Sequence, residues 1–448
     1  MNSGSIAILG AGMAGFGAAY ELFRHGVRAD LYEARPAHGG HTSTHIYDDG
    51  FTFDEGPHIS FTSDPRIQDL FAQSIGGKFE KLKAYVNNYW NGHWIKHPAQ
   101  VNLFGLPDNV IVPCIKDFVE AAYSDVDIIE NYEDWLRKSF GHSFAETFPM
   151  PYTRKYHTTD AKNLTTDWLG PRLYRPNLEE VLVGALKREP LDVHYVSNFR
   201  YPSAGGFVTY LDHFLPMANI NLDHRVVEID PDAKLLSFRG GKRVPYKELI
   251  SSIPLPELVR LITNVPDQVR AAADMLACTQ VVLVNIGLKG QIETPAQWTY
   301  FYDENISFAR LSYPSTFAAS MAPEGFCSVQ AEVYFSKKWK PMTTTPAEQI
   351  DRVIDGLLGC GIIKDRSDIV HRSVIFAPYA NIIFDHDRPA ALKIVHDYLD
   401  GLGIAYCGRY GDWGYMWTDE SFKSGERAAR IALEQLNALP ILPKVDLC

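Results

Sequence analysis

Near its start the chain reads Ile6-Ala7-Ile8-Leu9-Gly10-Ala11-Gly12-Met13-Ala14-Gly15, a short apolar run that enters a Gly-x-Gly-x-x-Gly turn. The residues that follow predict a helix from about Met13 to His25, which stops at Gly26. A second strand is expected from Val27 to Tyr32. Strand, glycine turn, helix and strand in this order are typical of a dinucleotide-binding Rossmann unit.

The glycines of this turn and the acidic residue beyond the second strand each have an expected role. Gly10 permits the tight turn, and Gly12 lets a pyrophosphate approach the backbone at the positive end of the helix. Gly15 allows the helix to pack closely on the strand. Glu33 is placed to accept hydrogen bonds from ribose hydroxyls, and its charge would repel a 2′-phosphate. NADP is therefore disfavoured in this pocket.

A second glycine pair, Gly39-Gly40, follows the acidic residue. In a large class of flavoproteins that the chain resembles here, a small-residue loop crowds the pyrophosphate from the other side, which favours FAD. A Rossmann domain that binds NAD remains the alternative. The residues that we expect to bind the cofactor in this region are Gly10, Gly12, Gly15, Glu33, Ala34, Arg35, Gly39, Gly40 and His41.

Length and composition narrow the class of protein. A chain of 448 residues exceeds what one hydrophobic core usually supports, so two interleaved domains are expected. Its 43 basic and 54 acidic residues give a net charge of −11, which argues against nucleic acid or an anionic membrane surface as a partner. Without a long apolar run, a secretion signal or Cys-x-x-Cys spacing, the sequence favours a cytoplasmic protein with reduced thiols and no metal cluster.

The pattern of expected elements gives an α/β fold, with a Rossmann-like FAD-binding domain, an inserted helical region and an antiparallel-sheet substrate domain. The helical region has amphipathic stretches at Ile115–Tyr123 and Asn131–Phe140. Val226 lies within a later strand, expected over Asn221–Ile229, and is either an adenine contact or an ordinary buried valine. The expected segments are 1–70, 196–265 and 396–448 for the FAD-binding domain, 71–195 for the helical insertion and substrate region, and 266–395 for the antiparallel-sheet domain.

Five further blocks, in order along the chain, resemble the UDP-galactopyranose mutases. These flavoenzymes contract a nucleotide-sugar pyranose to a furanose, and they lie within the broader class of amine oxidase and protoporphyrinogen-oxidase-like flavoproteins. Each block alone is a weak signal, but together they span nearly the whole chain. The blocks are Asp54–Asp64 with its Gly-Pro-His loop, Trp94–Asn102, Pro151–Tyr156 with Trp168–Arg172, Tyr300–Tyr313, and Gly408–Tyr415.

The resemblance implies a mechanism in which N5 of reduced FAD attacks the anomeric carbon and expels the diphosphate. The cofactor is then the nucleophile, so no Ser-His-Asp or Cys-His set is needed, and none is evident in the sequence. Block matching assigns Arg172 and Arg310 to the departing diphosphate, because guanidinium groups bind phosphate oxygens in pairs. His58 is expected beside the isoalloxazine, and these three residues form the expected catalytic set.

The remaining family positions are expected around the flavin and the substrate. Arg409 and Asp412 fall where flavin-edge and ribityl contacts are expected. The sequence departs from the family at Ala99, where a bulky aromatic is usual, and at His157, near which a Trp is usual. Loss of stacking surface there weakens the case for uridine. The expected substrate contacts are Gln100, Asn102, Tyr152, Tyr379 and Tyr415.

These observations favour a flavin-dependent mutase that converts a nucleotide-linked pyranose to the furanose. The alternative is a net redox enzyme of the amine oxidase or protoporphyrinogen-oxidase-like class. Converging arginines above the flavin would favour a diphosphate substrate, whereas an apolar tunnel would favour oxidation. NAD(P)H is a candidate external reductant, while the sugar, the nucleobase and self-association stay open.

Overall fold

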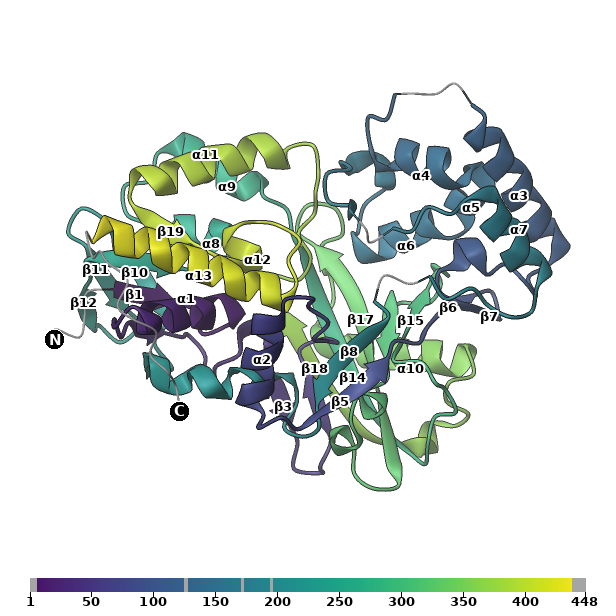
Figure 1. Cartoon of the computed structure of the whole chain (residues 1–448), viewed down its shortest axis with the longest axis horizontal. Coiled ribbons are helices and arrows are strands. Elements are labelled where there is room, and N and C mark those ends of the chain that lie inside the picture. Colours follow the sequence, from purple (N-terminus) through teal and green to yellow (C-terminus); the bar gives the residue numbers. More distant parts are fainter. Residues whose placement is uncertain (1–5, 125–127, 171–172, 194–195, 437–448) are drawn as a thin grey trace.

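Three separate stretches of the chain build the parallel sheet of the dinucleotide unit. The computed structural model describes residues 6–124, 128–170, 173–193 and 196–436 (Figure 1). Every pairing in this five-stranded sheet is parallel, as the Rossmann prediction requires. Its strands, in spatial order, are β19 (Ile404–Tyr406), β13 (Glu248–Ser251), β1 (Ile6–Leu9), β2 (Asp30–Tyr32) and β9 (Asn219–Asn221).

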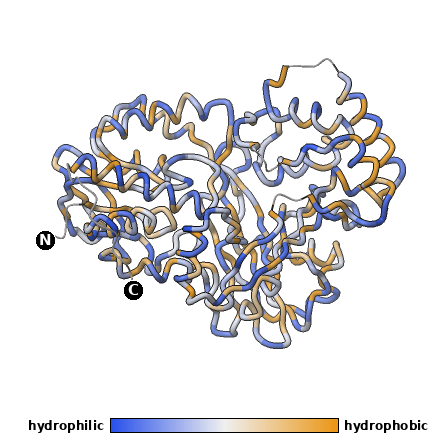
Figure 2. Tube along the Cα trace, viewed as in Figure 1, coloured by the Kyte–Doolittle hydropathy of each residue, from blue (hydrophilic) through white to orange (hydrophobic). Residues whose placement is uncertain are grey.

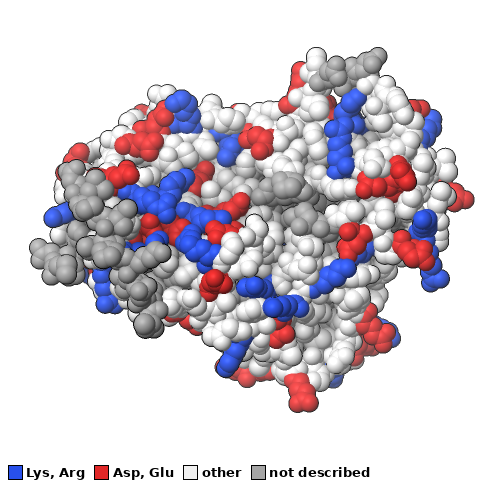
Figure 3. All heavy atoms as spheres, in the orientation of Figure 1, with Lys and Arg blue, Asp and Glu red and all other residues white. Residues whose placement is uncertain are grey.

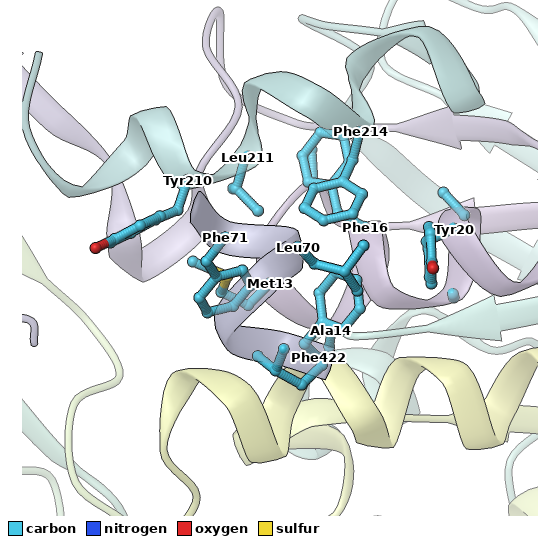
Figure 4. Packing of buried hydrophobic residues seen from close by; sticks show 14 of the residues in the cluster. Met13, Ala14, Phe16, Tyr20, Leu70, Phe71, Tyr210, Leu211, Phe214 and Phe422 are labelled. Atoms are coloured by element: carbon cyan, nitrogen blue, oxygen red, sulfur yellow. The ribbon is translucent and has the colours of Figure 1, made fainter. Parts of the chain in front are cut away.

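Two helices from opposite ends of the chain cover one face of this sheet. They are α1 (Met13–Arg24) and α13 (Thr418–Gln435), which lie side by side in Figure 1. Figure 4 shows Met13, Ala14 and Phe16 of α1 close to Phe422 of α13. The short helix α2 (Pro65–Ser74) adds Leu70 and Phe71 to the same core cluster. Residues some 400 positions apart in sequence therefore share one hydrophobic core.

The other face of the parallel sheet is covered by helices of the middle and C-terminal parts. A three-stranded antiparallel sheet packs beside them, and its first residue, Val226, belongs to their hydrophobic cluster. Alternating hydrophilic and hydrophobic colours along the helices in Figure 2 match their single buried face. These elements are α8 (Leu255–Leu261), α9 (Asp267–Met275), α11 (Arg388–Gly401), β10 (Val226–Asp230), β11 (Leu235–Phe238) and β12 (Arg243–Pro245).

A seven-stranded sheet forms the floor of the second region. Residues that we expected in a helical insertion supply β6 (Val86–Trp90) and β7 (His93–Lys96), and β6 pairs with β15 in parallel. The other pairings are antiparallel, as expected. The sheet continues with β15 (Trp298–Phe301), β16 (Arg310–Ser312), β17 (Phe326–Ser336), β14 (Thr279–Lys289) and β18 (Ile369–Ala377).

The helical part of the insertion stands above this sheet as a separate lobe (Figure 1). The expected helix at Asn131–Phe140 is present as α4. Asn131 caps its N-terminus, where the side chain accepts a hydrogen bond from the backbone amide of Asp134 at 3.0 Å. Phe140, Phe144 and Phe148 fill the core of the lobe. Its helices are α3 (Asp108–Ala122), α4 (Tyr132–Phe140), α5 (His142–Thr147), α6 (Pro149–Tyr156) and α7 (Leu178–Leu186).

Smaller elements join these parts. Two short antiparallel strand pairs and two further helices complete the framework: β3 (Thr44–Ile46) with β4 (Thr52–Asp54), β5 (Phe79–Lys83) with β8 (Asn198–Pro202), α10 (Gln349–Gly359) and α12 (Gly408–Gly411). On the face seen in Figure 3, basic and acidic side chains are interspersed. Two ion pairs join exposed arginines to buried carboxylates: Arg66 with Glu426 and Arg430 with Glu21. Within the described residues, no helix combines the length and apolar character needed to cross a membrane.

Candidate active site

A cavity of about 1140 Å³ opens where the parallel sheet, the seven-stranded sheet and the helical lobe meet. It exceeds the usual range for a single small ligand, about 300–1000 Å³, so it has room for a dinucleotide together with a substrate. Most residues expected from sequence line its wall: Gly10, Gly12, Glu33, Ala34, Arg35, Gly39, Gly40, His41, His58, Gln100, Tyr152, Val226, Arg310, Tyr379, Arg409 and Tyr415. Arg172 lies outside the described residues.

Two glycine loops meet at the end of this cavity that is next to β1. Gly10 has a φ of +101°, and a Cβ there would lie 2.3 Å from the hydroxyl of Ser252. The amide of Gly39 donates to the carbonyl of Ala11 at 2.8 Å. A Cβ on Gly40 would lie 3.0 Å from the Cα of Gly12. Side chains are thus excluded from the contact between the loops, which leaves bare backbone facing the cavity.

The positive end of α1 opens onto the same surface. Gly12 precedes the helix and supplies no side-chain cap, and the first turn carries no acidic residue. The first amide groups of a helix need an acceptor from outside the helix. A pyrophosphate would satisfy them and would be favoured by the helix dipole. The glycine cradle and the uncapped helix therefore fit a dinucleotide.

Glu33 is held with its carboxylate beside the glycine turn. One carboxylate oxygen accepts a hydrogen bond from the amide of Ala11 and the other accepts one from the amide of Arg35, both at 2.9 Å. The Arg35 guanidinium donates to the carbonyl of Gly40 at 2.8 Å and forms an ion pair with Glu55. Backbone amides thus fix the direction of the Glu33 carboxylate, and Arg35 ties the second glycine loop to the Gly-Pro-His segment.

Three residues expected at the site lie outside the cavity lining. Gly15 serves packing, as expected, because a Cβ there would lie 1.9 Å from the carbonyl oxygen of Gly10. Asn102 exchanges hydrogen bonds with the backbone of Leu191 at 2.8 and 3.1 Å. Asp412 forms an ion pair with Arg427 of α13. The last two side chains are engaged in joining segments of the protein.

His58 is partly buried between the glycine loop and its own Gly-Pro-His segment, and it lines the cavity. Its Nε2 lies 2.7 Å from the carbonyl oxygen of His41 and 3.3 Å from that of Glu55. Two carbonyl acceptors at Nε2 require the proton on this nitrogen and leave Nδ1 as an acceptor. Burial lowers the pKa of His58 to about 4. The imidazole is therefore neutral near pH 7, with a defined tautomer.

Arg310 lies on β16, directly opposite Glu332 of β17 and Tyr300 of β15. Its Nε donates to one oxygen of Glu332 at 2.7 Å, and the Tyr334 hydroxyl donates to the other oxygen. Burial opposes the charge on Arg310, but the Glu332 carboxylate outweighs it and raises the pKa of the guanidinium. Within the described parts of the chain neither Nη group has a hydrogen-bond partner, so both are left for a ligand in the cavity.

A second partly buried guanidinium, that of Arg409, lines the same cavity. It donates to the carbonyl of Met416 at 2.6 and 3.1 Å and lies 5.0 Å from the centre of the Tyr415 ring. Burial lowers the pKa of Arg409, but nearby tyrosines, first Tyr410 and Tyr415, raise it overall. The cavity therefore contains at least two permanent positive charges, at Arg310 and Arg409.

Tyrosines surround these cations. Tyr152 and Tyr156 stack with their ring centres 5.4 Å apart on successive turns of α6. The hydroxyl of Tyr379 donates to Glu257 at 2.6 Å, and Gln100 donates to the carbonyl of Tyr174 at 2.8 Å. Sequence reasoning did not single out the lining residues Tyr156, Tyr300, Glu332 and Tyr334. The alternation of Glu332 and Tyr334 along one strand would have been a signal for a polar face.

Three histidines that line the cavity make the stability of the fold sensitive to acid. Burial lowers the pKa of His41, His58 and His157 to about 4, from an ordinary value of 6.5. Between these values the unfolded chain binds protons that the folded chain does not, so stability is complete above pH 6.5 and falls as the pH drops. Asp54 acts in the opposite direction, because burial raises its pKa to about 6 and the folded chain keeps its proton.

We therefore expect these four groups together to bind a net of about two protons when the chain unfolds near pH 5.5. The free energy of unfolding should then fall by roughly 2.7 kcal/mol for each pH unit of acidification. Urea unfolding between pH 7.5 and 5 measures this slope. His157→Gln removes one of the three histidines and should make the slope shallower. A free energy of unfolding that stays constant or increases as the pH falls would contradict the expectation.

The comparisons with known proteins agree with this architecture. Residues 8–74 match the family model described as an NAD(P)-binding Rossmann-like domain. A solved structure of reduced UDP-galactopyranose mutase superposes with a TM-score of 0.89 at 25% identity, covering 99% of this chain and 98% of that one. Among the described residues, no group of His, Cys, Asp or Glu side chains is arranged to hold a metal ion.

More distant neighbours share the fold. A protein from Exiguobacterium sp. 255-15, named as a candidate protoporphyrinogen oxidase, superposes with a TM-score of 0.72 at 17% identity, covering 97% of this chain and all of that one. Cyclohexylamine oxidase from Brevibacterium oxydans has a TM-score of 0.65 at 13% identity, covering 97% of this chain and 100% of that one. The resemblance found in the sequence is thus confirmed at the level of the fold: along almost its whole length the chain has the fold of UDP-galactopyranose mutase, and it shares this fold with the two more distant neighbours.

Proposed function

We propose that the chain is a flavin-dependent mutase that converts a nucleotide-linked pyranose to the corresponding furanose. The observation that carries the proposal is Arg310, whose partly buried guanidinium is oriented through Nε while neither Nη group bonds to a described residue in the large cavity. A site for amine oxidation has no need of a cation at this position. A departing diphosphate needs one, because it is an anion with paired oxygens.

FAD is the cofactor in this proposal. Gly10, Gly12, Gly39 and Gly40 would hold its pyrophosphate, and Glu33 would bind the ribose hydroxyls. When bound in its reduced form, the flavin supplies a nucleophilic nitrogen, so the protein needs no nucleophile of its own. NAD(P)H is the proposed source of the electrons.

The side chains around the cavity then have separate tasks. Glu332 fixes the direction of Arg310, which binds the diphosphate and stabilises it as it leaves the sugar. Arg172 is proposed as the second arginine of this clamp. Tyr152, Tyr379 and Tyr415, together with Gln100, are proposed substrate contacts. The neutral His58 is proposed to present the lone pair of Nδ1 towards the flavin, since its Nε2 is already committed to backbone carbonyls.

Incubation with a panel of nucleotide sugars tests the proposal. The protein is reduced with dithionite under anaerobic conditions, and the products are separated by chromatography and weighed by mass spectrometry. We expect one sugar nucleotide to give a product of unchanged mass, and we expect the oxidised protein to be at least about a hundredfold slower, because it lacks the only nucleophile.

Two outcomes would contradict the mutase proposal. Equal turnover by the oxidised protein would show that reduction is not required. Reduction of the bound flavin by an amine, without isomerisation of any sugar nucleotide, would favour the oxidoreductase alternative. An inactive control is needed as well, and heat-denatured protein with added free FAD serves this purpose.

A further inference from the structure

A second cavity, of about 440 Å³, lies behind the wall that carries Arg310. Successive residues of β17 point to opposite faces of the sheet. Glu332 and Tyr334 line the main cavity, whereas Val333 and Phe335 line the second one. The helix α10, next to this sheet in Figure 1, forms part of its wall. The second cavity is therefore separate from the proposed active site.

Three basic side chains line this second cavity. Lys155 is 7% exposed, and its ammonium donates to the backbone carbonyls of Phe301 and Asp303 at 2.8 and 2.7 Å. Lys340 has its ammonium 5.4 Å from the ring centre of Phe335, and it forms no ion pair with any described residue. Arg352, in the first turn of α10, has neither an ion pair nor a hydrogen bond to any residue that the structure describes.

The carboxylates of the same wall are already neutralised. Glu304 accepts two hydrogen bonds from Arg154, at 2.8 and 2.9 Å, and Asp355 is paired with Arg366. The lining thus has an excess of positive charge.

We propose that this cavity is a second ligand site, which binds a phosphate-type oxyanion between Lys340 and Arg352. Lysine and arginine are the side chains that bind phosphate oxygens through charged hydrogen bonds. Glu304, Asn305 and Asp355 at the exposed rim leave the cavity open to solvent. Its volume lies within the range of sites for small organic ligands, so the anion can carry an organic group. The inference does not depend on the chemistry of the main cavity.

Calorimetric titration of the full-length, flavin-loaded protein tests the proposal. The probes are inorganic phosphate and glycerol 3-phosphate, and tighter binding of the second would show that the site takes an organic phosphate. We expect the double variant Lys340→Met/Arg352→Gln to bind its preferred probe at least about tenfold more weakly, because charged hydrogen bonds are lost. If the double variant does not fold, the exposed Arg352→Gln alone should weaken binding.

The controls separate this site from the main cavity. Lys337→Met removes a neighbouring exposed lysine that does not line either cavity, and it should leave the dissociation constant unchanged. Arg310→Lys should leave it unchanged too. The proposal is overturned if the wild-type protein binds neither probe, if the Lys340 and Arg352 variants bind as tightly as wild type, or if binding is lost in Arg310→Lys.

Discussion

Replacing Arg310 with lysine is expected to lower kcat for sugar-nucleotide turnover by at least about a hundredfold while the bound flavin is retained. Lysine keeps the positive charge beside Glu332, so the buried carboxylate is not left alone. A single ammonium cannot satisfy Glu332 and also present two further nitrogen donors to a diphosphate. The loss would therefore report the geometry of the guanidinium rather than its charge.

Steady-state turnover of the reduced protein and the visible spectrum of the flavin measure the two parts of this expectation. Arg154→Lys is a matched control, because Arg154 is a partly exposed arginine of α6 whose partner is Glu304 and which does not line the main cavity. It should keep activity within about twofold of wild type, since exposed ion pairs contribute little. Wild-type activity in Arg310→Lys would remove Arg310 from the proposed diphosphate clamp.

The glycine turn could be predicted from the sequence because its constraints are local. A positive φ at Gly10 and the absence of space for a Cβ at Gly15 are properties of a few neighbouring residues. The strand order around them also follows general rules for parallel sheets. This is why the fold class, and the meeting of the two glycine loops at one end of the cavity, agree with the sequence analysis.

The partner of Arg310 could not be predicted in the same way. Glu332 meets Arg310 only through the register of two antiparallel strands, and a shift of one residue would turn Glu332 to the other face of the sheet. Similarity to a family block predicts which residue occupies a position, but it does not predict which hydrogen bonds or ion pairs the side chain forms. Asn102 and Asp412 illustrate this, because both match family blocks and both side chains are bound to other parts of the protein.

The boundaries of the helical insertion could not be predicted from the sequence either, again for physical reasons. Helix α3 begins at Asp108, although the amphipathic pattern indicated a start at Ile115. Pro113 lies within the helix, and proline is usually a sign that a helix has not yet begun. The strand β6 pairs with its neighbour β7 along one edge, but along its other edge it pairs with distant residues, Trp298–Phe301. The local sequence does not indicate which distant segment such a strand pairs with.

The substitution Gly425→Ala is expected to destabilise the protein by about 3 kcal/mol or more and to release the flavin. Gly425 lies in α13 where this helix crosses α1, and a Cβ there would lie 1.9 Å from the carbonyl oxygen of Ala14 and 2.7 Å from the amide nitrogen of Ala18. Backbone atoms cannot yield as the end of a flexible side chain can. The helices would have to separate, and α1 is the helix whose first turn faces the proposed pyrophosphate site.

Gly401→Ala is the matched control for this experiment. Gly401 also lies in a helix, the last turn of α11, but nothing lies within 4 Å of the Cβ that alanine would add. Since alanine favours a helix over glycine, this variant should be unchanged or more stable by up to about 1 kcal/mol. Thermal unfolding and the fraction of FAD retained after gel filtration compare the two variants. Equal results for Gly425→Ala and Gly401→Ala in both measurements would contradict the close backbone packing of α1 against α13. They would also show that this packing does not position the first turn of α1 at the proposed pyrophosphate site.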